Sequence, residues 1–257
     1  MKFEPAEPQT CVTLGAGAAY LARMRLVLAS RSAGRAGLLD HAGVDFVQVD
    51  PPFDDPATAA RDLRGTEAVR DAATGLAAAK LASLAGGGAT PRVTPHLPRG
   101  VWVVAADTMC VGDGGAGAAL GKPLDRVEAA AMLHAWAEAP DGHAVVTGVA
   151  MGWWDGLRFQ AVQTFAETAY TRLVRVGPGG LSGYLDSGDW RGRSGGYDVL
   201  ERRAAGWEGA VRGSVDVVVG LPVRAVLERA GATSHPDAGL EVEVHGGSGG
   251  AAPGVER

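Results

Sequence analysis

Two residue types that often build sites in proteins are scarce in this chain. It has two cysteines in 257 residues, Cys11 and Cys110, and their spacing suits neither a metal-ligand pair nor a disulfide framework. The six histidines form no HExxH motif and no tight cluster, which argues against a zinc site. These absences favour a reduced, cytoplasmic setting and a chemistry that depends on other side chains.

Long apolar runs and an excess of positive charge are also missing. No stretch approaches the roughly 20 apolar residues that cross a bilayer, so no membrane segment is expected. The 24 Lys and Arg are outnumbered by 29 Asp and Glu, for a net charge of −5. Nucleic acid is therefore not expected as a partner, because no global basic field would attract its phosphates. Any phosphate recognition must be local.

The patterning of a folded domain is confined to the middle of the chain. We expect a flexible N-terminal extension over residues 1–23, a folded domain over residues 24–232 and a disordered tail over residues 233–257. The tail is rich in Gly, Pro and acids and lacks apolar periodicity. Met24 directly precedes the first predicted strand, which leaves Met1 and Met24 as alternative starts.

Apolar periodicity and turn residues predict a mixture of strands and helices. The strands are expected at Arg25–Ala29, Val44–Val49, Val101–Ala106, Ala144–Trp154, Arg158–Leu173 and Val215–Val219. The helices are expected at Ala33–Ala42, Glu67–Leu84, Val127–Ala137 and Leu181–Leu185, and from Pro222 to Arg229 with Gly231 just past the end. The fold class is therefore α/β, with a mixed sheet and two lobes around a central cleft.

The most informative stretch is Val101–Thr108, a predicted buried strand that ends in Asp107 and Thr108. Open α/β sheets bind ligands at the carboxyl ends of such strands. A carboxylate there could bind a divalent cation and accept a proton from a water, although many such aspartates only cap a turn. Asp54 and Asp55, in the loop after the second strand, are either solvated or include a second metal ligand.

Three cations could bind phosphate near this acid. Lys80 falls on the apolar stripe of its helix, so its ammonium either snorkels to water or reaches into a cleft. Lys122, between a glycine and a proline, is an ordinary loop lysine or a second phosphate ligand. Ser30, Ser32 and Arg35 lie where a strand turns into a helix, a place that binds anions. The alternative there is that Ser32 only caps the helix while Arg35 faces solvent.

Together these segments resemble the Maf family of nucleoside triphosphate pyrophosphatases, also called septum-formation inhibitor-like proteins. The family's Leu-Ala-Ser-x-Ser-Pro-Arg-Arg-x-x-Leu-Leu is matched by Leu28–Leu39, its Ala-Asp-Thr by Ala106–Thr108 and its Leu-Gly-Lys-Pro by Leu120–Pro123. Further matches follow in the family's order at Glu128–Leu133, His143–Gly148, Ser194–Tyr197 and Val219–Pro222. The resemblance covers the chain from about Arg25 to Ala230.

The resemblance implies a house-cleaning enzyme that cleaves a nucleoside triphosphate to the monophosphate and pyrophosphate with Mg²⁺ or Mn²⁺. Residue by residue, it matches Asp107 to the family's proton acceptor and Thr108 to a residue that helps set base specificity. Asp54 falls at a usual glutamate and would hold the metal with Asp107. The positions that it matches to the phosphate site are Ser30, Arg35, Lys80 and Lys122.

Besides Asp54 and Ala33, which stands at the motif's proline, two positions of the specificity set depart from the family pattern. Gly34 replaces an arginine and Leu200 stands at a usual glutamine, and both belong to the specificity set in well-studied branches. Thr108 is typical of the branch that acts on dTTP and UTP, whereas the branch that prefers 7-methylguanosine triphosphate has glutamine there. The preferred base therefore stays open.

Two rival functions remain at this point. One is a catalytically weak nucleotide-binding regulator of septum formation or cell division, motivated by Gly34 and Leu200. The other is an inosine-triphosphate-type pyrophosphatase on a similar two-lobed scaffold. The nucleoside triphosphate is the only partner that the resemblance implies, and the sequence leaves a homodimer open.

Overall fold

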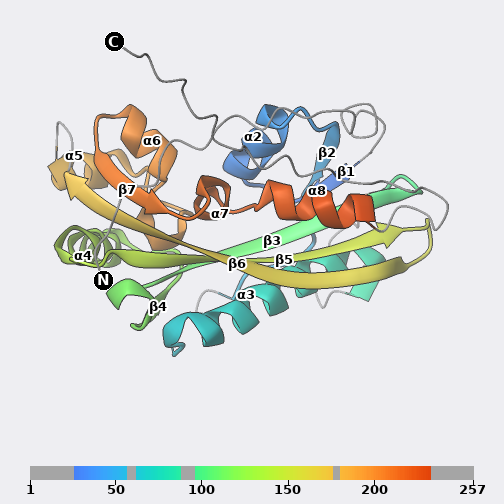
Figure 1. Ribbon diagram of the computed structural model, residues 1–257, viewed down its shortest axis with the longest axis horizontal. Coiled ribbons are helices and arrows are strands. Elements are labelled where there is room, and N and C mark those ends of the chain that lie inside the picture. The colour runs from blue at the N-terminus through green and yellow to red at the C-terminus, as the bar shows by residue number, and fades with distance from the viewer. Residues whose placement is uncertain (1–25, 57–61, 88–95, 176–179, 233–257) are drawn as a thin grey trace, which may run out of the picture.

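The computed structural model describes residues 26–56, 62–87, 96–175 and 180–232 (Figure 1). The extension and the tail expected at residues 1–23 and 233–257 lie outside these ranges. Across the described ranges, no helix combines the length and apolar character that crossing a membrane requires.

A mixed sheet of seven strands runs the length of the described molecule. Its order is β2-β1-β3-β5-β6-β7, and β4 pairs with β3 beside this path. β1 runs parallel to β2 and to β3, while the remaining pairs are antiparallel. The bounds are β1 Leu26–Ala29, β2 Phe46–Val49, β3 Val101–Val111, β4 Ala119–Leu120, β5 His143–Trp154, β6 Phe159–Arg175 and β7 Glu208–Arg212. The predicted α/β class with a mixed sheet is confirmed.

Helices cover both faces of this sheet (Figure 1). The helix α3 lies along one face, and α2, α7 and α8 lie on the other, with α4, α5 and α6 gathered toward one end. The bounds are α2 Ala33–His41, α3 Gly65–Ala82, α4 Arg126–Glu138, α5 Gly180–Ser187, α6 Val199–Ala204, α7 Val215–Val219 and α8 Val223–Ala232. A central sheet covered on both faces is why its middle strands are nearly continuous apolar runs.

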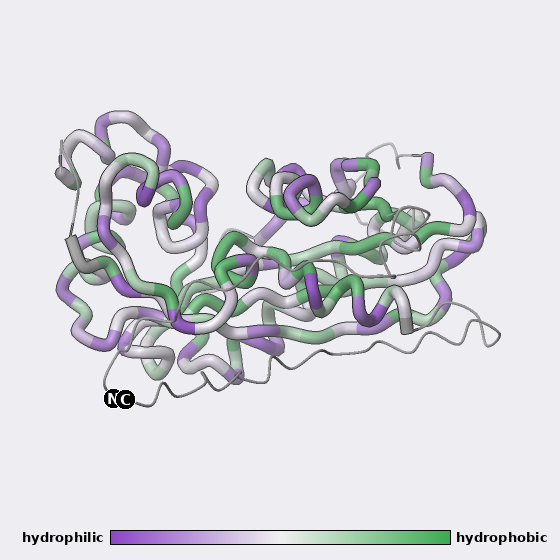
Figure 2. The backbone as a smooth tube through the Cα atoms, turned by 45° about the horizontal axis from the view of Figure 1, so that its top comes forward, coloured by the Kyte–Doolittle hydropathy of each residue, from purple (hydrophilic) through white to green (hydrophobic). Residues whose placement is uncertain are grey.

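Successive side chains of the central strands pack into two different cores, since neighbours along a strand point to opposite faces. On β3, Trp102, Val104 and Ala106 pack toward α2 and α8. Val103 and Ala105, the residues between them, pack against α3. Figure 2 shows hydrophobic colour along the inner strands of the sheet.

The strand β3 is longer than predicted, and this changes the setting of its two polar residues. Asp107 and Thr108 were expected at the end of the strand, but β3 pairs with β5 from Val101 to Val111. The acid interrupts the apolar run without interrupting the backbone pairing. On its other side, β3 pairs with β1 only as far as Ala105, and its pairing with β4 starts only at Cys110. Among the described strands, residues 106–109 therefore have one neighbour and leave an open edge.

The strand predicted at Val215–Val219 is wrong, because this segment forms the helix α7. Ser214 occupies the N-cap position, and Gly220 ends the helix in the left-handed conformation with a φ of 115°. A short run of β-branched residues has no periodicity that separates a strand from a helical turn. The predicted end of the last helix is also wrong, since α8 continues through Gly231 to Ala232.

Candidate active site

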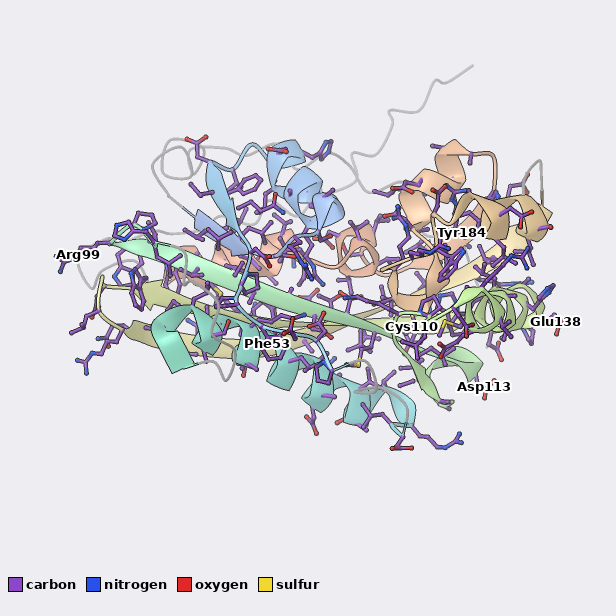
Figure 3. All side chains as sticks on the ribbon, turned by 180° about the vertical axis from the view of Figure 1, so that it is seen from behind. Phe53, Arg99, Cys110, Asp113, Glu138 and Tyr184 are labelled. Carbon is purple, nitrogen blue, oxygen red and sulfur yellow. The ribbon has the colours of Figure 1, made fainter. Side chains whose placement is uncertain are left out.

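A cavity of about 1090 Å³ lies beside the open edge of β3. One side comes from the β1–α2 turn and α2, and the other from the segment between Arg191 and Glu201. These two sides stand on the same face of the sheet, so they form the two lobes predicted around a cleft. Phe53 and Cys110, both labelled in Figure 3, belong to the lining. The volume suits a nucleotide-sized ligand.

Two lysines and two aspartates form a chain of alternating charges in this cavity. Nζ of Lys80 lies 2.5 Å from Oδ1 of Asp107 and 2.8 Å from Oδ1 of Asp55. Nζ of Lys122 lies 2.9 Å from Oδ2 of Asp55. Lys80 thus contacts the aspartate of β3 directly, and Lys122 is linked to it through Asp55. Lys80 does not escape to water, because its side chain is only 9% exposed.

Asp55, which contacts both lysines, has a shifted pKa. Partial burial alone would raise the pKa of its carboxyl. The hydrogen bonds and charges of Lys80 and then of Lys122 outweigh burial, so the pKa of Asp55 lies below its ordinary value. Asp55 is therefore ionised near neutral pH and holds the two ammonium groups together.

Of the two acids in the loop after β2, Asp55 is the one whose contacts with the lysines are resolved. Asp55 contacts both lysines and lines the cavity, and Asp54 precedes it outside that lining. Both acids follow Phe53 in a loop where neighbouring side chains point in different directions, so the pattern alone did not distinguish them. The metal-ligand role that the resemblance implies for Asp54 stays a prediction, and the contacts of Asp55 make it a second candidate for that role.

Arg35 is held inside the cavity instead of facing solvent. Its guanidinium donates from Nε to the carbonyl of Gly220 at 2.7 Å, from Nη1 to Oγ of Ser30 at 3.1 Å and from Nη2 to Oγ1 of Thr108 at 3.0 Å. Burial lowers its pKa, and the negative charges of Asp107 and Asp55 oppose the shift. Ser32 caps α2 as predicted, by accepting from the backbone N–H of Arg35.

The open edge of β3 explains how groups from both faces of the sheet meet. Asp107 shares the face that carries Met109 and Val111, and there it contacts Lys80 of α3. Thr108 points to the opposite face, toward Arg35. With no described strand on the side of residues 106–109 away from β5, both side chains reach the same cavity. This is a gap between strands, the kind of place where open sheets bind ligands.

The donor set fits a divalent metal that also binds phosphate. The carboxylates of Asp55 and Asp107 converge on the same ammonium, so a small ion could bind between them. The described part of the chain contains no group of three or more His, Cys, Asp or Glu arranged to hold a metal. Mg²⁺ is often held by one or two carboxylates together with substrate phosphates and waters, which is the set available here.

The two positions that depart from the family pattern lie in the same cavity. Gly34 is in the first turn of α2, where an added Cβ would meet Cγ1 of Val219 at 3.1 Å. Leu200, in the first turn of α6, is 44% exposed although it is a large apolar residue. Both therefore face the space that a ligand would occupy.

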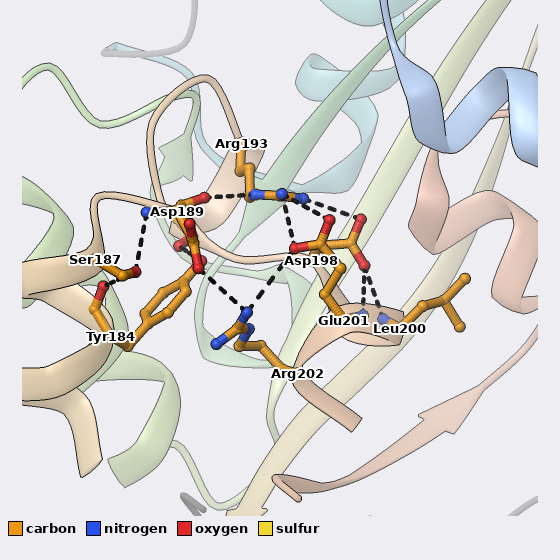
Figure 4. Close-up of polar contacts among 9 residues, drawn as sticks. Tyr184, Ser187, Asp189, Arg193, Asp198, Leu200, Glu201 and Arg202 are labelled. Carbon is orange, nitrogen blue, oxygen red and sulfur yellow. Dashed lines mark hydrogen bonds and ion pairs between the residues drawn. The ribbon is translucent and has the colours of Figure 1, made fainter. Parts of the chain in front are cut away.

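Sequence reasoning missed the ionic cluster that holds this edge of the cavity (Figure 4). Nη1 of Arg193 lies 3.2 Å from Oδ2 of Asp198, and Nη2 donates to both carboxylate oxygens of Glu201 at 2.8 Å. Asp198 also caps α6, accepting from the backbone N–H groups of Leu200 and Glu201. The spacing of an Asp three residues before a Glu is a helix-start signal that could have found it.

The chain is similar in sequence to known proteins. A family model described as "Maf-like protein" matches residues 25–231. The "dTTP/UTP pyrophosphatase" of Hyphomonas neptunium is 32% identical over 214 residues, which are 80% of this chain and 95% of the relative. The "dTTP/UTP pyrophosphatase" of Caulobacter vibrioides is 34% identical over 205 residues, 79% of this chain and 92% of the relative.

A solved structure was also found at greater distance. It is the nucleoside-triphosphatase or dITP/XTP pyrophosphatase of Mycobacterium abscessus, with 17% sequence identity and a TM-score of 0.34. The match covers 81% of this chain and 95% of that one.

Proposed function

The chain belongs to the Maf-like protein family, and from that membership and the cavity we propose that it hydrolyses a nucleoside triphosphate to the monophosphate and pyrophosphate. The enzyme class, a hydrolase that acts on acid anhydrides, is confirmed by the names of the relatives. A house-cleaning role in the cytoplasm, removing unwanted nucleotides, remains our expectation.

The observation that carries this proposal is the charge chain from Asp107 through Lys80 and Asp55 to Lys122. The Lys80–Asp107 pair is buried, and buried ion pairs are a weak source of stability, because desolvation offsets the attraction. Two lysines and an arginine around two carboxylates do match the needs of a triphosphate with a divalent ion. The arrangement is therefore better explained by ligand binding than by folding.

In the proposed mechanism, Arg35, Lys80 and Lys122 bind the phosphate oxygens and balance their charge. The phosphates compete with Asp55 and Asp107 for the two ammonium groups, so both carboxylates become available to a divalent metal. Such a metal, when bound, would supply charge neutralisation of the phosphate oxygens and a more acidic water. Positioning and electrostatic stabilisation are expected to give most of the rate enhancement.

Asp107 is proposed to accept the proton of the attacking water. The water oxygen forms a bond to the α-phosphorus, the bond from that phosphorus to the bridging oxygen breaks, and pyrophosphate leaves. Among the four charged residues, Asp107 suits this role because it lies on the rigid strand β3, beside the cavity. A general base must be held within reach of the proton it takes.

For the base, we propose dTTP or UTP as the preferred substrates. The support is the activity stated in the names of the relatives and the presence of Thr108, whose hydroxyl contacts Arg35 inside the cavity. Gly34 and Leu200 change the lining relative to the family pattern, so modified pyrimidine nucleotides belong in any substrate panel.

A panel of common and modified nucleoside triphosphates, with Mg²⁺ and with Mn²⁺, tests the proposal. Pyrophosphate and monophosphate should form in equal amounts, fastest with a pyrimidine nucleotide. In ¹⁸O-labelled water, the label should enter the monophosphate, since water attacks the α-phosphorus. Release of orthophosphate, or label in pyrophosphate, would refute this reaction. Tight nucleotide binding without metal-dependent turnover would favour the regulatory function that the changes at Gly34 and Leu200 suggest.

A further inference from the structure

The short segment Ser194–Gly196 lies directly on the open edge of β3. Gly195 has a φ of 71°, and a Cβ there would come 2.7 Å from Sγ of Cys110. No other residue type could approach β3 so closely in this conformation. The segment therefore packs against the strand itself.

Hydrogen bonds fix the segment to its surroundings on several sides. The backbone N–H of Gly195 donates to the carbonyl of Gly121 at 2.9 Å, next to Lys122. Nε1 of Trp136 donates to the carbonyl of Gly195 at 2.8 Å, and the hydroxyl of Tyr184 donates to the carbonyl of Gly196 at 3.0 Å. Because these hydrogen bonds fix the backbone of Ser194–Gly196, the segment can in turn restrict the position of the β3 backbone that it contacts.

The hydrogen bond that links this segment to the site comes from Ser194. Its hydroxyl donates to the backbone carbonyl of Thr108 at 2.6 Å. That carbonyl belongs to the part of β3 that has no second neighbouring strand, so the side chain of Ser194 takes the place that a strand would otherwise fill. An edge carbonyl with a short, partly buried hydrogen bond is less free to move than one that faces water.

Thr108 is where several groups of the site meet. Its backbone is joined directly to Asp107, and its hydroxyl accepts from Nη2 of Arg35 at 3.0 Å and contacts Oγ1 of Thr147 at 3.0 Å. A displacement of the Thr108 backbone would therefore move both the proposed base and a proposed phosphate ligand. Small displacements matter, since about 1 Å of misplacement can lower a rate by about a hundredfold.

We propose that Ser194 is a positioning residue, which acts through the Thr108 carbonyl to hold Asp107 and Arg35 in their reactive geometry. The preceding residue strengthens the case, because Arg193 forms ion pairs with Asp198 and Glu201 of the same cavity wall (Figure 4). Two consecutive residues thus connect α6, which carries Leu200, to the strand that carries Asp107. This inference rests on the proposed function, because Asp107 is positioned for that reaction.

The test compares Ser194→Ala with the conservative Ser194→Thr and with the control Ser187→Ala. Ser187 also donates to a backbone carbonyl, that of Tyr184 at 2.8 Å, but it lies outside the cavity. For each variant, kcat and KM are measured on protein whose folding is verified by thermal denaturation. We expect Ser194→Ala to lower kcat about tenfold with KM changed less than about threefold, because the lysines do not depend on Ser194. Ser194→Thr should restore kcat, and Ser187→Ala should leave it unchanged.

The proposal fails if Ser194→Ala keeps the kcat of the wild type, if Ser187→Ala lowers kcat equally, or if the hydroxyl of threonine restores nothing. A loss of thermal stability with normal kcat would also overturn it, since that would show a purely structural role. These outcomes differ from failure of the proposed function, in which the wild type itself releases no pyrophosphate. In that case, unchanged hydrogen exchange across residues 106–110 in Ser194→Ala would still overturn the inference.

Discussion

The ammonium of Lys80 lies 2.5 Å from a carboxylate oxygen of Asp107, although the two residues are 27 positions apart and come from different layers of the fold. Their side chains are 9% and 11% exposed. Removal of one partner from a buried pair leaves an uncompensated charge, whereas replacement of both partners is often nearly neutral. We can therefore predict how changes to this pair affect the free energy of unfolding, without reference to any substrate.

Lys80→Met should lower the free energy of unfolding by about 3 kcal/mol, because Asp107 is left buried without its closest cation. The double variant Lys80→Met with Asp107→Asn should recover most of that loss, since no buried charge remains at β3. Urea denaturation of the wild type, both single variants and the double variant measures the coupling. Losses that simply add would contradict the account of the pair.

The second prediction separates the two neighbouring acids of the β2–α3 loop. Asp55→Asn should lower metal-dependent turnover by about a hundredfold, because it removes a carboxylate that contacts both lysines. Asp54→Asn changes the charge equally and serves as the matched control, with turnover expected within about twofold of the wild type. A steady-state assay at saturating Mg²⁺ decides between them. A larger loss of turnover in Asp54→Asn than in Asp55→Asn would assign the metal-ligand role to Asp54, as the resemblance implies.

The third prediction concerns the glycine that ends α7. Gly220 has a φ of 115°, and a Cβ there would come 2.8 Å from Oγ1 of Thr108 and 3.1 Å from Nε of Arg35. Gly220→Ala should therefore displace Arg35 and lower turnover by at least about tenfold.

The control for this change is Gly231→Ala, in the last turn of α8, where nothing lies within 4 Å of the added Cβ. It should leave turnover unchanged and raise the free energy of unfolding by about 0.5 kcal/mol. Both variants are compared by kcat and by chemical denaturation. Equal activity in the two would mean that the Gly220 contact does not position Arg35.

The fourth prediction is a pH dependence of stability from His143. This side chain is stacked on Trp136 with ring centroids 3.9 Å apart, and burial lowers its pKa to about 3. The unfolded chain binds a proton below a pKa of about 6.5 while the folded chain does not, so stability is lost as the pH falls through this range. At pH 5 the loss should be about 2 kcal/mol relative to pH 7.5.

His143→Phe keeps an aromatic ring against Trp136 and removes the titrating group. Its free energy of unfolding should therefore fall less between pH 7.5 and pH 5 than that of the wild type, by about the same 2 kcal/mol. Parallel slopes for the two proteins would show that His143 is protonated in the folded state or is more accessible than its burial indicates.

The site was predicted best where local patterns report on the surroundings of a residue. The apolar stripe of α3 placed Lys80 in the interior, and there it lies. The strand-turn-helix at Ser32 placed Arg35 at an anion site, and its guanidinium lines the cavity. Such predictions succeed because helical periodicity and capping are determined by residues close in sequence.

The failures came where the outcome depends on distant parts of the chain. The length of β3 is set by eleven residues of pairing with β5, which no local pattern at Asp107 reveals. Val215–Val219 is four valines around Asp216 but forms the helix α7 between β7 and α8. The role of Asp55 depends on two lysines contributed by other elements. In each case tertiary contacts overrode local propensity.

The most direct test of the central claim is pyrophosphate release by Asp107→Asn, measured with dTTP and UTP in the presence of Mg²⁺ and with the fold checked by circular dichroism. The substitution keeps the shape of the side chain and removes its ability to accept a proton. The account predicts release by the wild type and a loss of at least about a thousandfold in the variant, with the fold retained. Near-normal turnover by folded Asp107→Asn would contradict it.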